Sequence, residues 1–113
     1  MNRWHLTDEI KEKFVPIVKE YLNKMETMPE EEFEEEEYDL DLSDTGINPS
    51  QLWQLLEEEF GYKEVDIDEN GWEQDFWIRM KRTDGKTFSN GSEHLTISCC
   101  GMTFEVKLGV YYE

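Results

Sequence analysis

Apolar residues recur at about every fourth position near the start of the chain, which is the period of one helical face. Thr7 is suited to be the N-cap of this helix, and Asp8 and Glu9 would lie in its first turn. Pro16 falls inside the pattern, where it removes a hydrogen-bond donor and clashes with the preceding turn. We therefore expect either a kinked helix or two short helices. The apolar stripe comprises Ile10, Phe14, Val18, Leu22 and Met25.

A second helix is predicted from Pro49 to Phe60. Asn48 is its expected N-cap, Gln51 can complete a capping box, and Gly61 is the expected stop. The predicted buried stripe of this helix contains Leu52, Trp53, Leu56 and Phe60.

Alternation of apolar and polar residues predicts strands in most of the remaining chain. In Tyr38–Leu42, the apolar residues Tyr38, Leu40 and Leu42 would face inward, and Ser43–Gly46 would form a loop. Two further strands, Glu64–Asp68 and Gln74–Lys81, flank Asn70-Gly71, a pair of residues typical of a type I′ hairpin turn. With that turn, Val65 pairs with Phe76 and both face the core.

The last hairpin is predicted to turn at Gly101-Met102. Asp84-Gly85 marks another turn, but a two-residue loop there would set Phe88 opposite Lys81, so we expect a longer connection. The last hairpin would pair Cys99 with Phe104, Ile97 with Val106 and Leu95 with Leu108. Together, these elements predict one α+β domain over residues 1–113. It has an antiparallel sheet of four or five strands, with two amphipathic helices packed on one face.

The charge of the chain is concentrated in a central segment. The 113 residues contain 28 Asp and Glu against 11 Lys and Arg, for a net charge of -17. The acidic segment 29–75 holds 19 acidic residues and a single basic one, Lys63, while the two flanks are nearly neutral. The charge is therefore not a solubility feature spread evenly over the surface. It also argues against direct nucleic-acid binding, because the protein would repel phosphates.

Two runs of glutamate differ in how well local electrostatics explains them. Glu30–Glu32 follow Pro29 at a predicted start of a short helix, where the helix dipole favours negative charge. Glu57, Glu58 and Glu59 lie in the last turn of the second helix, where the dipole disfavours it, and Lys63 alone is close enough in sequence to offset them. We interpret this triplet either as part of an interface or as a solvated face that tolerates the cost.

No combination of residues predicts an enzyme or a cofactor site. Asp66, Asp68 and Asn70 match the first half of a calcium loop, but Trp77 occupies the position where a bidentate Glu is required. Cys99 and Cys100 point to opposite faces of a strand, and no further ligands stand at zinc-site spacing. We expect Cys99 in the core, no resident metal or cofactor, and at most weak cation binding by the Asp66–Gly71 turn.

The function class that the sequence favours is an interaction protein or inhibitor, which docks an acidic face on a basic partner. The excess of 18 acidic charges corresponds to roughly 30 Å of duplex DNA, a length close to the size of such a domain. The partner could therefore be a nucleic-acid-handling protein, with this chain acting as a DNA mimic. The predicted contact residues are Glu34, Glu35, Glu36, Glu37, Asp39, Asp41, Glu57, Glu58, Glu59 and Trp77.

Trp77 would be an exposed aromatic anchor, as would Trp72, or Trp77 would instead pack with Trp4 in a second small cluster. Two alternative functions stay open: a calcium- or other cation-dependent module, and an accessory structural subunit. No apolar run has the length of a membrane span, and Met1–Glu9 lacks the apolar stretch of a secretion signal. We therefore expect a cytoplasmic protein without membrane contact.

Overall fold

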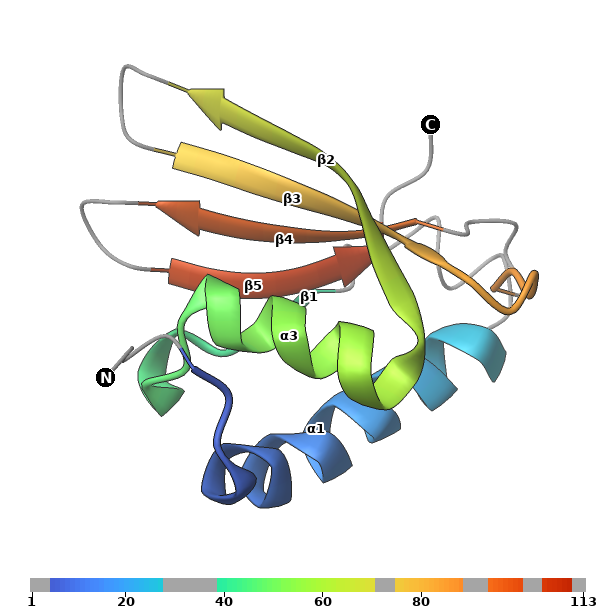
Figure 1. Ribbon diagram of the computed structural model, residues 1–113, viewed down its shortest axis with the longest axis horizontal. Coiled ribbons are helices and arrows are strands. Elements are labelled where there is room, and N and C mark those ends of the chain that lie inside the picture. The colour runs from blue at the N-terminus through green and yellow to red at the C-terminus, as the bar shows by residue number, and fades with distance from the viewer. Residues whose placement is uncertain (1–4, 28–38, 71–74, 89–93, 101–104, 111–113) are drawn as a thin grey trace.

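The computed structural model describes residues 5–27, 39–70, 75–88, 94–100 and 105–110. Within these residues, five strands form one antiparallel sheet in the order β1-β5-β4-β3-β2, and two α-helices pack against it (Figure 1). This is the predicted α+β fold, with the larger of the two strand numbers. The elements, in chain order, are α1 (Asp8–Thr27), β1 (Asp39–Asp41), the 3-10 helix η1 (Ser43–Thr45), α3 (Pro49–Phe60), β2 (Tyr62–Asn70), β3 (Asp75–Arg82), β4 (His94–Cys100) and β5 (Glu105–Val110).

The first helix is continuous through its proline. The Thr7 hydroxyl accepts a hydrogen bond from the Ile10 N–H at 3.3 Å, which is the predicted cap. Pro16 lies inside α1, so the alternative of two short helices is wrong. The apolar stripe continues on both sides of Pro16 and is buried against the rest of the core, which supports the helix despite the lost hydrogen bond. The buried residues of α1 are Phe14, Val18, Tyr21, Leu22 and Met25.

The second helix begins and ends where the sequence predicts. The Asn48 side chain accepts the Gln51 N–H at 2.9 Å, and the Gln51 side chain accepts the Asn48 N–H at 3.2 Å, which completes the capping box. Gly61 ends the helix in the left-handed conformation, with φ of 70°. The buried side differs from the prediction, because Trp53 and Phe60 are only half-buried and Leu55 is fully buried. α3 contacts both α1 and the sheet, so it buries a wider arc than one stripe.

The core lies between the helices and one face of the sheet. Residues of the inner face alternate along the strands with residues of the opposite, open face, where Arg79 and Lys81 are exposed. Cys99 lies on the inner face and is buried, as predicted. The other buried inner-face residues of β3, β4 and β5 are Ile78, Met80, Leu95, Ile97, Val106, Leu108 and Val110.

Both predicted hairpin registers are wrong, although the faces are mostly right. Cys99 pairs with Val106 and Ile97 with Leu108, a shift of two residues from the predicted pairs. A shift of two leaves every side chain on its predicted face, so alternation cannot detect it. Phe104 and the predicted turn at Gly101-Met102 lie outside the described residues.

In the other hairpin, Asn70 pairs with Asp75, and Phe76 pairs with Glu69. Asn70 is therefore still part of β2, and the two-residue turn at Asn70-Gly71 is wrong. A β-bulge between Glu64 and Asp66 leaves Val65 without a cross-strand partner in β3. Val65 is 49% exposed, so it does not reach the core as predicted.

The remaining connections agree with the predictions in part. Leu40 is half-buried in β1 and Leu42 is buried just after it, whereas Ser43–Thr45 forms a 3-10 helix in place of a loop. A long connection joins β3 to β4, as expected, because Lys81 pairs with His94. The short helix predicted from Pro29 lies outside the described residues.

Candidate functional site

The two predicted contact residues in β1 lie on the open face of the sheet. Leu40 points inward, so Asp39 and Asp41 point the other way, and both are exposed. Asp41 accepts hydrogen bonds from the Ser43 hydroxyl at 2.5 Å and from the Ser43 N–H at 3.0 Å. These two bonds, in that order, lower the pKa of Asp41. The neighbouring candidates, Glu34–Glu37, lie outside the described residues.

Trp77 also belongs to the open face, as the sequence predicts. It lies on β3 between Asp68 of β2 and Ser98 of β4, and it is half-buried. It is thus neither a fully exposed anchor nor a core residue. Trp4 and Trp72, the other two tryptophans considered with it, lie outside the described residues.

Among the described residues, the open face carries charges of both signs in nearly equal number. Basic residues stand on three of its strands, and Lys107 is the direct cross-strand neighbour of Asp41. Asp39, Asp41 and Trp77 therefore belong to a surface of mixed charge, which lacks the single-sign field that the sequence led us to expect there. Its basic residues are Lys63, Arg79, Lys81 and Lys107, and its acidic residues are Asp39, Asp41, Asp66, Asp68 and Glu105.

The glutamates at the end of α3 have partners that the sequence did not reveal. Lys11 of α1 places its Nζ 3.2 Å from Glu58 and 3.6 Å from Glu59, and the bond to Glu58 is the main cause that raises the pKa of Lys11. The Trp53 indole N–H donates to Glu57 at 2.5 Å. The expectation that Lys63 alone offsets this triplet is therefore wrong, because α1 supplies a cation from a distant part of the sequence. All three glutamates are nonetheless exposed.

The predicted contact residues do not form one surface. Asp39, Asp41 and Trp77 lie on the open face of the sheet, whereas Glu57–Glu59 lie in the helical layer that covers the other face. These residues were predicted to share one contact face mainly because most of them are acidic. The order of the elements in space places them on two different sides of the molecule.

Asp66, Asp68 and Asn70 all lie within β2, so the chain does not curl around a cation there. Asp66 pairs with Arg79, and Asp68 pairs with Trp77, across regular strands. Among the described residues, no group of three or more His, Cys, Asp or Glu side chains is arranged to hold a metal ion.

The same segment contains a feature that sequence reasoning missed. β2 forms one edge of the described sheet, and its side chains Val65 and Ile67 are 49% and 45% exposed. The alternation of Val65 and Ile67 with acidic residues predicted a strand with one face toward the core. It did not predict that the helices leave these two side chains uncovered. The glutamates of α3 lead through Gly61 directly into β2. We define the acidic rim as Glu57, Glu58, Glu59, Glu64, Asp66, Asp68 and Glu69.

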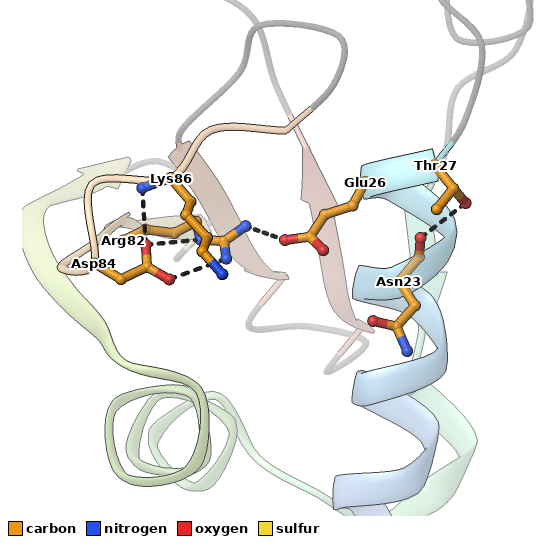
Figure 2. A network of polar contacts seen from close by, with 6 residues as sticks. All are labelled: Asn23, Glu26, Thr27, Arg82, Asp84 and Lys86. Atoms are coloured by element: carbon orange, nitrogen blue, oxygen red, sulfur yellow. Dashed lines mark hydrogen bonds and ion pairs between the residues drawn. The ribbon is translucent and has the colours of Figure 1, made fainter.

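A cavity of about 370 Å³ opens between α1, the end of α3 and the start of β2. In its wall, the Arg82 guanidinium donates to Glu26 of α1 and to both carboxylate oxygens of Asp84, at 3.3 and 3.1 Å (Figure 2). Burial raises the pKa of Tyr62, which also lines the cavity. The charged side chains around the cavity are balanced in sign, so they favour no class of ligand. They are Lys19, Glu26, Glu59 and Arg82.

Comparison with protein-family models, with curated proteins and with solved structures finds no match to this chain. Within the described residues, no helix combines the length and hydrophobicity needed to cross a membrane.

Proposed function

We propose that this protein is a non-enzymatic interaction protein that docks its acidic rim on a basic partner. One observation carries the proposal. Of the seven acidic side chains of the rim, six are exposed, and Lys63 is the only basic residue between Glu57 and Glu69 in the sequence. Exposed charges of one sign speed the encounter with an oppositely charged protein and select against like-charged ones.

The partner class that fits is a protein with a nucleic-acid-binding cleft. Such clefts are basic, and the excess charge of the acidic segment equals that of roughly 30 Å of duplex. The protein measures 43 × 34 × 25 Å, so it is of the right size to occupy such a cleft. In this role it would act as an inhibitor that competes with nucleic acid.

The test uses the triple variant E57Q/E58Q/E59Q, with E12Q/E20Q/E105Q as the matched control that removes three exposed charges elsewhere. Partners are captured from host lysate at low salt and eluted with a salt gradient, and association rates with the captured protein are then measured. We expect the rim variant to associate several-fold more slowly and to elute at lower salt, because charged rims control the association rate. The control should behave like the wild type.

Three outcomes would contradict the proposal. A complex that survives high salt unchanged would indicate an accessory structural subunit. Equal effects of the rim and control variants would mean that only net charge matters. If duplex DNA does not displace this protein from its partner, the partner's nucleic-acid cleft is not the binding site.

A further inference from the structure

The edge formed by β2 is open to pairing. Within the described residues, β3 is the only strand that pairs with β2, and Figure 1 shows that β2 starts beside the end of α3 and that its later part extends along the border of the sheet away from both helices. Alternate N–H and C=O groups of an edge strand point away from its neighbour and are available to another chain. The bulge interrupts the edge only between Glu64 and Asp66. After it, Asp66–Asn70 pairs with Asp75–Arg79 without a shift, which leaves a regular stretch for a further strand.

Apolar side chains accompany this free backbone. Ile67 lies opposite Ile78, which is 3% exposed, yet Ile67 itself is 45% exposed because neither helix covers this end of the face. Val65, at the bulge, is 49% exposed. The described residues contain one other exposed large apolar side chain, Ile17 on α1. A strand added to β2 would bury Ile67 and satisfy the free backbone groups together.

The charged side chains of β2 determine which kind of partner strand can pair with this edge. Asp66 and Asp68 point to the open face, and Ile67 and Glu69 point to the inner face. We propose that Asp66–Asn70 binds an extended segment of a partner in which lysine or arginine alternates with an apolar residue. The basic residues would lie opposite Asp66 and Asp68, and an apolar residue would lie opposite Ile67. This inference rests on the proposed function, since it names the kind of segment that the basic partner presents.

A second copy of this chain fits the edge poorly. Antiparallel pairing of two β2 strands centred on Ile67 would place Asp66 directly opposite Asp68 at two positions. Like charges directly opposite each other are destabilising, and charged side chains are a common means of keeping edge strands from pairing with themselves. The same charges attract a basic strand, so Asp66–Asn70 favours a basic partner segment over a second copy of this chain.

The probe is a blocked synthetic peptide in which lysine and valine alternate, compared with the same peptide methylated on its backbone nitrogens. The methylated peptide keeps its charge, but its backbone nitrogens have no hydrogen to donate to the C=O groups of β2, so it cannot complete the hydrogen-bond ladder of a paired strand. Binding is measured by isothermal titration, and amide hydrogen exchange locates the site. We expect the unmethylated peptide to bind at low salt and to slow exchange in β2 but not in β1.

Two sets of variants locate the charge and the apolar contact. D66N/D68N should weaken peptide binding by about tenfold, and I67T should weaken it by several-fold, because each removes a cross-strand interaction. The control E12Q/E20Q removes the same number of exposed charges from α1 and should leave affinity within about twofold of the wild type. The substituted side chains are all exposed, so we expect every variant to fold, and circular dichroism is the measurement that checks this.

Each failure has a distinct meaning. Equal binding of the methylated peptide would overturn strand addition while leaving charge-driven docking, and therefore the proposed function, intact. Failure to bind any basic partner in a salt-sensitive manner would overturn both. A dimer in sedimentation that the I67K variant dissociates would show that a second copy occupies the edge, which also overturns the inference.

Discussion

Lys11 changes how the glutamates at the end of α3 are understood. The helix dipole disfavours Glu58 and Glu59 at that position, and nothing nearby in the sequence compensates fully. In the structure, the Lys11 ammonium lies within 4 Å of both carboxylates. The triplet therefore does not need a function to explain its presence. The case for the acidic rim rests on its exposure and on the edge of β2, which pairs only with β3 in the described part of the chain.

Asp84 offers a test of a single interaction. It accepts the Lys86 N–H at 2.9 Å and a bidentate bond from Arg82, and these contacts, the backbone bond first, lower its pKa. A carboxyl group with a lowered pKa in the folded state stabilises the fold above its unfolded pKa, about 3.9, and loses that contribution as the pH falls through the folded value. We expect D84N to be less stable than the wild type at neutral pH, and the difference to close in acid.

Urea unfolding at a series of pH values measures this difference. D44N, at an exposed aspartate of η1, is the matched control. We do not expect its stability difference from the wild type to close in acid as that of D84N does. If the gap between D84N and the wild type stays constant down to about pH 2, the charge of Asp84 is not what stabilises the fold.

At the scale of elements, the sequence predicts where helices start and stop better than how strands pair. The limits of α3 depend on Asn48, Gln51 and Gly61, which act on backbone groups a few residues away. Strand pairing depends on residues far apart in sequence. The alternation of apolar and polar residues determines which face Ile97 lies on. It does not distinguish a partner from one two residues away, and Ile97 pairs with Leu108 rather than with the predicted Val106.

The capping box of α3 can be tested directly. Replacing Asn48 by Ala removes the acceptor of the Gln51 N–H and should lower the free energy of unfolding by about 1 kcal/mol. N48D keeps an acceptor at the same position and should retain most of the stability. Urea unfolding distinguishes the two, and equal losses in both variants would show that the cap is not the source of the stabilisation.

At the scale of the whole molecule, the charge of -17 acts against the compact state. Repulsion among exposed carboxylates is screened by salt, with a Debye length of about 10 Å at 0.1 M. We expect sodium chloride to raise Tm at neutral pH. A gain of about 1 kcal/mol would correspond to roughly 4–8 °C for a domain of this size.

The control is the same titration near the sequence pI of about 4.3, where the net charge is close to zero and the effect of salt should nearly vanish. Differential scanning calorimetry gives Tm in both series. An equal rise at both pH values would mean that salt acts by a mechanism other than screening of the net charge.

The sequence by itself determined the α+β class, both ends of the second helix, the inward face of most strands and the concentration of charge in the acidic segment 29–75. These properties follow from local periodicity, from capping chemistry and from composition. It could not determine the hairpin registers, because shifts by two residues preserve every face.

Only the tertiary structure decided which charges share a surface. It separated Asp39 and Asp41 from Glu57–Glu59, paired Lys11 with Glu58, and left Ile67 exposed on an edge strand of the described sheet. Each of these outcomes depends on the distance between segments that are remote in the chain, and such distances are set by how helices and sheet pack together.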